Sequence, residues 1–395
     1  MNKKISLGIA IALMALVAAV TFIISTGYSM TLYNSLVADV QQRAEMYTRL
    51  EQIDTYVRTY YNGKINEDDL IEALADAYVD VLGDNYSKYY NSTEYTLYKE
   101  HLSGTHLGIG IYAEEIGGYP QVTDVISNSP AEGAGIAIGE SIVEINGKSV
   151  LEMGYETASA LLTTEAGTPL VLKIRSSGAD RTVSVSTVKM TIASVKTAIY
   201  NGYGYIKVHE FSEKTFQQFN AAYTMLKSNG VKGIIIDLRN NQGMIYEPVF
   251  NLLNELLPEN SVCYTKTDFA GKKTTINSTS GSWELNVPVV CIINSRTSGP
   301  AELLAASLRD GVGAAIVGTT SNGNAQYTEL YPLYDNTAIS LPSHTLQSER
   351  TAYNGVGIKP DFDVLMTNDT NKDLLNYTEQ TDGCIRKSLE ILSQK

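Results

Sequence analysis

An uncharged, apolar stretch near the N-terminus constrains this chain more than any other feature. Lys3 and Lys4 precede a stretch from Ile5 to Ile24 without a charged residue, and the next charge is Asp39. Such a stretch forms a helix of about 30 Å, the thickness of a bilayer core. Because lysines ahead of a span stay in the cytoplasm, we predict a cytoplasmic stub and transmembrane anchor over residues 1–28. The body would then be extracytoplasmic, on a single-pass protein of the cell membrane.

A cleaved signal peptide is the alternative interpretation of the same stretch. Ser25, Thr26 and Gly27 offer small residues to a signal peptidase. The apolar part of a signal peptide usually runs about 7–15 residues, however, and this stretch is longer. We therefore favour an uncleaved anchor, although both interpretations place the body outside the cytoplasm.

Composition excludes two broad classes of function. The 395 residues suffice for two or three domains, and 30 basic against 43 acidic residues give a formal charge of −13. An acidic chain without a basic block lacks the electrostatic footprint of a nucleic-acid-binding protein. The three cysteines, Cys263, Cys291 and Cys384, form no C-x-x-C pair, and the four histidines have no zinc-ligand spacing with them. We predict no metal site and no cofactor, and assign Cys263 and Cys291 to the core.

Residues 31–100 are predicted to be helical. Apolar residues from Leu36 to Tyr60 recur mostly at three- and four-residue steps, which indicates an amphipathic helix. Asn66 resembles the cap of a second helix, and Gly83 follows its last apolar residue, Leu82. Packing of these helices on the body is the simplest expectation; a stalk or a dimer contact are alternatives.

Residues 104–190 are predicted to form a β-rich module. Short alternating runs are broken by Gly, Asn and Pro, as is typical of strands and turns: Pro120–Ile126, Ser141–Ile145, Leu170–Arg175 and Thr182–Val188. Ser129-Pro130-Ala131 is followed by Gly133-Ala134-Gly135-Ile136, Gly139-Glu140 and Val143-Glu144-Ile145-Asn146-Gly147. This order resembles a PDZ domain, with Glu140 where aspartate is usual.

The PDZ resemblance implies a binding site for the C-terminal peptides of other proteins. In that resemblance, the loop Leu107-Gly108-Ile109-Gly110 supplies the backbone N–H groups that hold a terminal carboxylate. Glycines let the backbone approach the ligand closely, and the peptide adds as a strand to a sheet edge.

Residues 195–366 alternate between strand and helix patterns, which predicts an α/β core of layered helices and sheet. Gly233–Leu238 is a continuous apolar run ending in Asp237-Leu238, as in a strand buried on both faces. The other predicted strands are Gly204–Val208, Val289–Ile293 and Ala314–Val317, and the predicted helices are Glu213–Ser228, Tyr246–Leu257 and Pro300–Arg309. Residues 370–395 are predicted to be a linker and a C-terminal helix that contains Cys384.

Three further motifs, together with the PDZ signature, indicate a family. Leu82–Ser87 is similar to "L-G-D-P-Y-S", Asp237–Gly243 to "D-L-R-N-N-P-G-G", and Gly357–Asp361 to "G-I-K-P-D". In this order, the motifs resemble those of the carboxyl-terminal processing peptidases, or tail-specific proteases. The resemblance runs from about residue 45 to about residue 365.

The resemblance implies a serine nucleophile, a lysine base and an assisting glutamine, and this chain departs from all three. Thr297–Leu303 is similar to the family's "T/S-A-S-A-S/A-E" segment, with Gly299 at the nucleophile position. The lysine and glutamine positions hold Asn324 and Thr328. Glycine carries no nucleophile and an asparagine amide is no base near neutral pH. Gly243 remains as an oxyanion-hole candidate, although Met244 replaces its partner glycine.

Two functional hypotheses follow from this departure. In the first, a catalytically inactive homologue binds C-terminal tails as a scaffold or regulator, as a homo-oligomer or in mixed oligomers with an active relative. In the second, the chain is a serine endopeptidase that uses Ser298 as a displaced nucleophile, with His209 or His344 as its base. A one-residue shift at this turn redirects the side chain, and no spacing pairs either histidine with Ser298. We therefore favour the first hypothesis.

Overall fold

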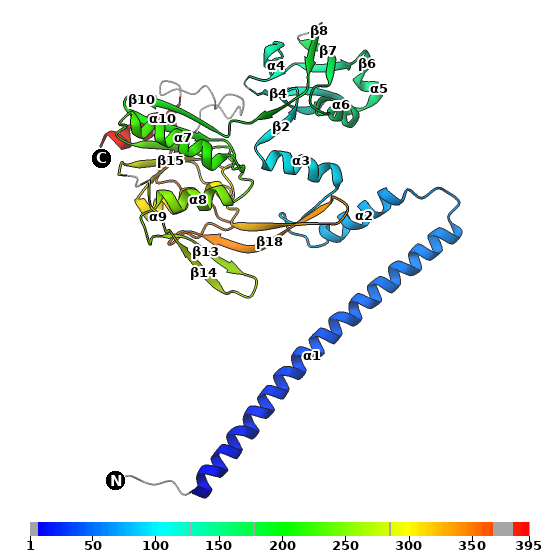
Figure 1. Ribbon diagram of the computed structural model, residues 1–395, viewed down its shortest axis with the longest axis vertical. Helices are drawn as coiled ribbons and strands as arrows, with labels where there is room; N and C mark the ends of the chain where they lie inside the picture. The colour runs from blue at the N-terminus through cyan, green and yellow to red at the C-terminus, as the bar shows by residue number, and fades with distance from the viewer. Residues whose placement is uncertain (1–6, 127, 177, 284–285, 366–381, 395) are drawn as a thin grey trace. The chain divides into compact units, whose positions relative to one another are not determined.

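The computed structural model describes residues 7–126, 128–176, 178–283, 286–365 and 382–394. The chain divides into two compact units, residues 1–71 and residues 72–395, drawn in Figure 1. The first unit contains the long helix α1 and the start of α2. The second contains the β-rich module and the α/β core.

In the first unit, α1 runs without a break from Leu7–Tyr60. The predicted anchor, ending at residue 28, and the predicted helical region, starting at residue 31, thus lie on one continuous helix. No proline interrupts these residues, so the backbone hydrogen bonds continue through the expected boundary. Over the described residues, no helix combines the length and the apolar character needed to cross a bilayer. The structure thus does not support the predicted transmembrane anchor.

Two shorter helices follow. The helix α2 (Glu67–Asp80) begins after Asn66, and three acidic residues in its first turn stabilise its positive N-terminal end. Gly83 then adopts a left-handed φ of 69°, which favours glycine. After β1 (Lys88–Tyr90), α3 (Ser92–Leu102) is capped by reciprocal hydrogen bonds between Asn91 and Glu94.

The β-rich module holds a six-stranded antiparallel sheet, ordered β3-β4-β5-β7-β8 with β6 paired to β5. Its strands are β3 (Ile111–Ile116), β4 (Tyr119–Val125), β5 (Ser141–Ile145), β6 (Lys148–Ser149), β7 (Pro169–Ser176) and β8 (Ala179–Ser186). The helices α4 (Pro130–Gly133), α5 (Val150–Met153) and α6 (Tyr155–Leu162) close its apolar core. A separate ribbon of β2 (Thr105–Gly108) and β9 (Val188–Thr191) joins the module to the rest of the chain.

The core sheet is ordered β10-β11-β12-β15-β16-β19, and every pair except β10–β11 is parallel. Its strands are β10 (Val195–Tyr200), β11 (Tyr203–Val208), β12 (Ile234–Asp237), β15 (Val289–Ile293), β16 (Ala315–Gly318) and β19 (Phe362–Asp363). All four residues of β12 are buried, as the continuous apolar run predicted.

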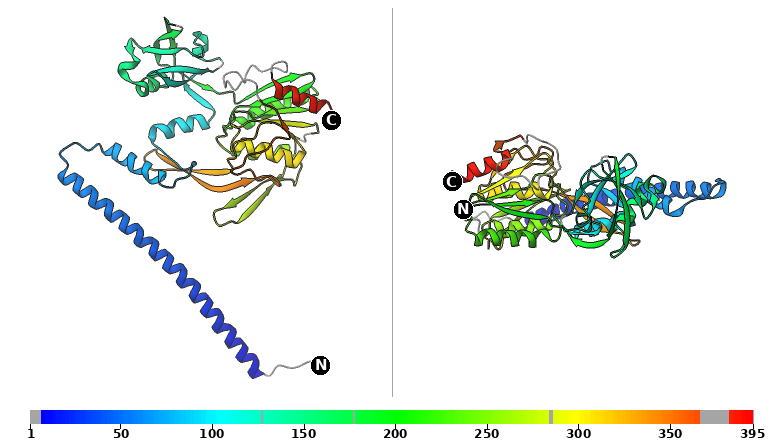
Figure 2. Two further views of the ribbon diagram at one scale, coloured as in Figure 1. Left: turned by 180° about the vertical axis from the view of Figure 1, so that it is seen from behind. Right: turned by 90° about the horizontal axis from the view of Figure 1, so that it is seen from above.

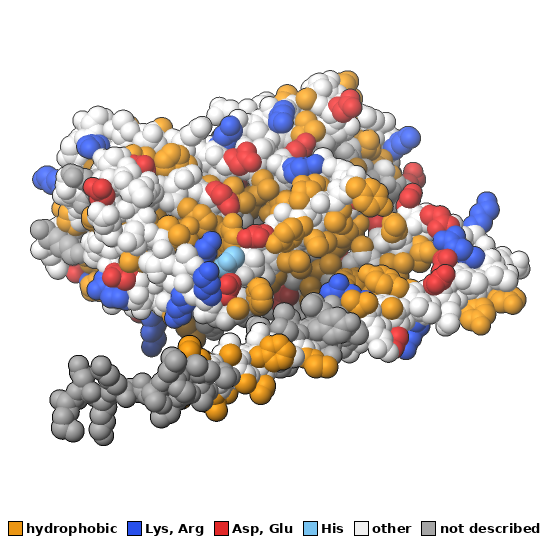
Figure 3. Space-filling model, turned by 60° about the horizontal axis from the view of Figure 1, so that its bottom comes forward, with side chains coloured by type: hydrophobic (Ala, Val, Ile, Leu, Met, Phe, Trp, Pro, Cys, Tyr) orange, Lys and Arg blue, Asp and Glu red, His pale blue; other side chains and the backbone are white. Residues whose placement is uncertain are grey.

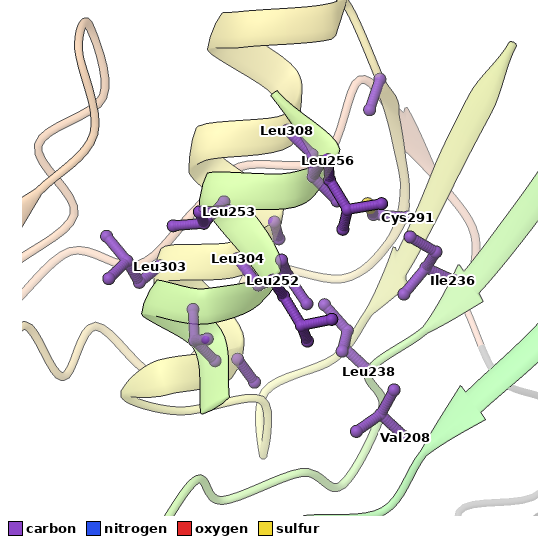
Figure 4. Close-up of a cluster of buried hydrophobic side chains, with 14 of the residues drawn as sticks. Val208, Ile236, Leu238, Leu252, Leu253, Leu256, Cys291, Leu303, Leu304 and Leu308 are labelled. Carbon is purple, nitrogen blue, oxygen red and sulfur yellow. The ribbon is translucent and has the colours of Figure 1, made fainter. Parts of the chain in front are cut away.

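Helices cover both faces of the core sheet (Figure 2). One face packs against α7 (Thr215–Ser228), α8 (Glu247–Leu256) and α9 (Pro300–Val312). Figure 4 shows leucines of α8 and α9 meeting Val208, Ile236, Leu238 and Cys291 in this layer. The other face packs against α10 (Gly383–Ser393), which buries Cys384, Ile385 and Leu392. These findings confirm the α/β class of the fold.

A buried charge network also holds α10 on the sheet. Arg239 forms ion pairs with Asp237 at 2.5 Å and with Asp382, the cap of α10, at 2.7 Å. Lys207 pairs with Asp237 at 3.3 Å, and all four side chains are nearly inaccessible to solvent. Of the linker and helix predicted over residues 370–395, residues 370–381 lie outside the described residues.

A second sheet, which the sequence did not predict, lies beside the α/β layers. It joins β13 (Val262–Asp268), β14 (Lys273–Asn277), β17 (Gln326–Pro332), β18 (Ala338–Gln347) and β1. β17 and β18 form a hairpin, and β1 and β13 pair with the opposite edge of β18. β17 is thus an edge strand of this sheet.

Candidate functional site

The tight turn between β15 and α9 carries the residues at the expected nucleophile position. Gly299 caps α9 with φ 57° and ψ −118°, a conformation that L-residues rarely adopt, and Pro300 follows at the first helical position. The Ser298 N–H donates to the carbonyl of Asn241 at 2.9 Å, which fixes the turn against the segment after β12. In α/β-hydrolases, a strained strand-to-helix turn presents the nucleophile.

The structure brings Gly299 and Asn324 together, as the motif spacing implied. A Cβ atom built on Gly299 would lie 3.7 Å from Nδ2 of Asn324 and 3.5 Å from the hydroxyl of Tyr246. Asn324 accepts a hydrogen bond from the N–H of Gln326 through Oδ1 at 3.0 Å, so its amide group directs Nδ2 toward the turn. Gly299 has no side chain that could act as a nucleophile, and the amide of Asn324 is no base near neutral pH.

A buried carboxylate, Glu302, holds these two positions in place. Oε2 accepts the N–H groups of Gly299 at 3.1 Å and Asn324 at 2.8 Å, while Oε1 accepts from Gly323 and Ser321. Burial raises the pKa of Glu302, and the four hydrogen bonds oppose that rise. Part of this role could have been inferred from the sequence, because a glutamate at the third position of a helix commonly accepts a hydrogen bond from the backbone N–H of the cap residue.

Ser298 has no base beside it in the structure. Its Oγ lies 3.4 Å from the amide oxygen Oδ1 of Asn322, and an amide does not accept a proton near neutral pH. Nδ1 of His344 is hydrogen-bonded to Ser343 instead. Over residues 178–283 and 286–365, which include both histidines, the structure shows no hydrogen bond from His209 or His344 to Ser298.

Gly243 lies against the same turn, but its N–H is already used. It donates to Oδ1 of Asn241 at 2.9 Å, so it is not free for an oxyanion in this structure. A Cβ on Gly243 would lie 2.5 Å from Cδ of Pro300, which explains why glycine is required. Met244 retains a φ of 151°, a value that favours glycine, at the position where the family has its second glycine.

Thr328, at the expected glutamine position, lies on β17 rather than at the turn. It forms part of the wall of a cavity of about 250 Å³ together with Tyr246 and Tyr327. The hydroxyl of Tyr246 donates to the carbonyl of Gln326 at 3.1 Å. Because Tyr246 also borders Gly299, the cavity adjoins the turn. Tyr246 was predicted only as the first residue of a helix, and nothing in the sequence indicated that it borders this site.

The peptide-binding loop of the β-rich module also has the expected surroundings. The carbonyl groups of Ile109 and Gly110 accept backbone hydrogen bonds from Ala131 and Ile126. Their N–H groups, by contrast, have no acceptor among the described residues. Gly108 and Gly110 have φ values of 145° and 88°, which favour glycine. Leu107 is half-buried on β2, and the loop opens onto β3, the edge strand of the sheet.

Comparisons with known proteins assign both modules. Residues 202–364 match the model of peptidase family S41, and residues 121–176 match the PDZ domain model. The core is therefore similar to peptidase family S41. Carboxy-terminal processing protease CtpA of Bacillus subtilis is 25% identical over 363 residues, covering 91% of this chain and 77% of the relative. The carboxy-terminal-processing protease of Bartonella bacilliformis is 26% identical, covering 82% and 76%.

Solved structures show the same fold. A photosystem II D1 C-terminal processing protease superimposes with a TM-score of 0.50 at 22% identity, covering 80% of this chain and 86% of the other. A putative S41 protease from Bacteroides fragilis has a TM-score of 0.54 at 17% identity, covering 81% and 90%. The predicted resemblance to PDZ-containing tail-specific proteases is therefore confirmed. The assignment of Gly299, Asn324 and Thr328 to the catalytic positions of the family remains a prediction.

Proposed function

We propose that this S41 homologue captures C-terminal tails of other proteins through its PDZ module and does not cleave them, acting as a scaffold or regulator. The observation that carries the proposal is the contact between the Cβ position of Gly299 and the amide of Asn324. Where an S41 protease needs a nucleophile and a base, this chain has neither. The N–H of Gly243 donates to Asn241, so it is not available as an oxyanion-hole donor, which would otherwise contribute to catalysis.

Three features of the PDZ module support tail binding. The N–H groups of Ile109 and Gly110 are free of acceptors among the described residues, as a carboxylate-binding loop requires. β3 is the edge strand beside them, so a peptide can extend the sheet. The hydroxyl of Tyr155 on α6 reaches the carbonyl of Ala113 on β3 at 3.4 Å, which places α6 along the same edge.

The proposal also places the body outside the cytoplasm. That part rests on the lysines and the apolar stretch at residues 3–24, whether the stretch is retained or removed. Assembly with a second copy or with an active S41 relative would let a tail-binding homologue regulate proteolysis. Cross-linking of full-length chains, followed by mass spectrometry, tests this assembly.

A binding and cleavage assay tests the central proposal. Full-length chain is mixed with an unstructured protein bearing an apolar C-terminus; binding is followed by anisotropy and the products by mass spectrometry. We expect binding without cleavage, lost in Leu107→Asp and retained in the matched control Ile116→Asp, an exposed position at the far end of β3. Cleavage that disappears in Ser298→Ala would overturn the proposal and establish a displaced nucleophile.

A further inference from the structure

The cavity beside the turn has a composition that the missing catalytic groups do not explain. It lies between α3, residues 244–247 and β17, and we call it the tyrosine pocket. Four tyrosines line it, Tyr98, Tyr246, Tyr327 and Tyr331, together with the carboxylates Glu247 and Glu329. No lysine or arginine is among its lining residues in the described part of the chain.

The carboxylates of the pocket are held by the tyrosine hydroxyls. Tyr327 donates to Oε1 of Glu247 at 3.2 Å, and Tyr331 donates to Oε2 of Glu329 at 2.7 Å. Burial raises the pKa values of Tyr98 and Tyr327 to about 12, with the charge of Glu247 adding to both shifts. The hydroxyls therefore stay protonated at neutral pH, and the pocket lining has two carboxyl side chains without a basic one among the described residues. On the face of the molecule shown in Figure 3, hydrophobic side chains are interspersed with both acidic and basic ones.

This combination matches one class of side chain. A lysine or arginine has an apolar stem that packs along leucine and aromatic surface, and a cationic head that seeks carboxylates and ring faces. Leu102 and Leu330 complete the apolar wall. We propose that the tyrosine pocket holds a lysine or arginine side chain of the tail that the PDZ module captures. The inference rests on the proposed function, since it concerns the same bound polypeptide.

The place of the pocket supports this occupant. Tyr246 lines the pocket, and its hydroxyl lies 3.5 Å from the Cβ position of Gly299. A chain segment that crosses the turn would therefore direct a neighbouring side chain into the pocket. Thr328, shorter than a glutamine, forms part of the same wall. Selectivity for a basic residue would distinguish the tails that this homologue retains.

A peptide scan tests the proposal with full-length chain. Fluorescent peptides share one apolar C-terminus and carry a single lysine at each upstream position in turn, with norleucine in the matched peptides. The norleucine series measures tail capture alone, and lysine minus norleucine measures the pocket. We expect lysine to tighten binding about three- to tenfold at one or two adjacent positions, as for a partly exposed cation beside rings and carboxylates.

Two substitutions and a control assign any gain to the pocket. Glu247→Gln and Glu329→Gln remove charge but retain an oxygen acceptor for Tyr327 and Tyr331. In the double variant the gain from lysine should fall to less than twofold, while norleucine peptides bind as before. Glu259→Gln is the matched control, because Glu259 is exposed beyond the C-terminal end of α8, whereas Glu247 begins that helix; this variant should leave the gain unchanged.

The outcomes separate the two proposals. If the norleucine peptides bind but lysine gives no gain at any position, the pocket proposal fails and tail capture stands. The same conclusion follows if the gain survives in the double variant. If no peptide of either series binds, or if Leu107→Asp has no effect, tail capture itself fails and the pocket proposal fails with it.

Discussion

Gly299 and Asn324 donate their backbone N–H groups to the same carboxylate oxygen, Oε2 of Glu302. These residues occupy the nucleophile and base positions that the motif spacing indicates. In our proposal, the backbone still brings these two positions to contact distance, with glycine and asparagine in place of a nucleophile and a base. Because Glu302 shapes both turns through backbone groups, its role is independent of the side chains at residues 299 and 324.

Replacing Glu302 with alanine should destabilise the core strongly. The substitution removes the acceptor of four donors, from Gly299, Ser321, Gly323 and Asn324. Buried donors left without an acceptor cost about 1–3 kcal/mol each when none can relax, so we expect a loss of at least about 3 kcal/mol. Urea unfolding, followed by the fluorescence of the single tryptophan Trp283, measures this change.

A control separates this effect from the general loss of a carboxylate. Glu390→Ala removes an exposed glutamate of α10 that pairs with Lys387, and should change the unfolding free energy by less than about 0.5 kcal/mol. If the unfolding free energy of Glu302→Ala lies within about 1 kcal/mol of wild type, the loss is on the scale of an ordinary surface substitution. That result would show that the four donors find other partners.

Restoring serine at residue 299 should reduce stability. The φ of 57° and ψ of −118° at Gly299 lie where a side chain is strained, and such strain costs about 1–3 kcal/mol. The neighbouring atoms do not prevent the change, because a Cβ would meet Tyr246 and Asn324 at ordinary contact distances. We expect Gly299→Ser and Gly299→Ala to lower the unfolding free energy by similar amounts, measured by urea unfolding.

Gly133→Ala is the matched control for the strain. Its Cβ would meet open space and its φ lies outside the left-handed region, so the change should be neutral or slightly stabilising. If both variants at residue 299 match wild type in stability, the turn relaxes around the new side chain. Backbone strain would then not explain why glycine is favoured at this position.

The sequence predicted the core strands well because burial on both faces leaves a continuous apolar run. β15 matches the predicted Val289–Ile293, and β12 (Ile234–Asp237) lies within the predicted Gly233–Leu238. The sheet of β13, β14, β17 and β18 was missed because its strands are half-exposed and rich in polar residues, as in Lys273–Asn277. Local patterning of this kind does not distinguish an edge strand from a loop.

The site was predicted in part for a similar reason. Motif spacing paired Gly299 with Asn324, and the structure brings the two together, with Nδ2 of Asn324 lying 3.7 Å from the Cβ position of Gly299. Tyr246 and Tyr98, which come from distant segments, carry no local signal that they share a cavity with β17. The acceptor of the Gly243 N–H, Oδ1 of Asn241, also depends on a side-chain rotamer that a motif does not reveal.

The three cysteines should resist thiol reagents in the folded protein. Cys263, Cys291 and Cys384 are buried, and burial raises their pKa values to about 11, 12 and 11. The thiolate is the reactive form, so at pH 8 little of it exists and access is blocked. Titration with a chromogenic disulfide reagent should detect less than one thiol per chain before unfolding and all three in urea. Rapid reaction of one thiol in the native state would contradict this.

Acid should destabilise the core through His209. Burial, with Lys207 and Lys196 adding like charge and Asp237 opposing, lowers the pKa of His209 to about 3, while an unfolded histidine titrates near about 6.5. The unfolded state then binds the extra proton between these values. The stability that neutral His209 preserves is complete above pH about 6.5 and is lost as the pH falls toward about 3.

His209→Gln measures that contribution because glutamine stays neutral throughout. Between pH 7.5 and pH 4.5 the wild type should lose about 2–3 kcal/mol more unfolding free energy than the variant, as followed by Trp283 fluorescence in urea at each pH. Trp283 stacks on Phe216 and Tyr223 of α7, so it reports on the core rather than on the PDZ module. Equal losses in the two proteins would mean that His209 is hydrated and titrates normally, since the imidazole would then gain no proton preferentially on unfolding.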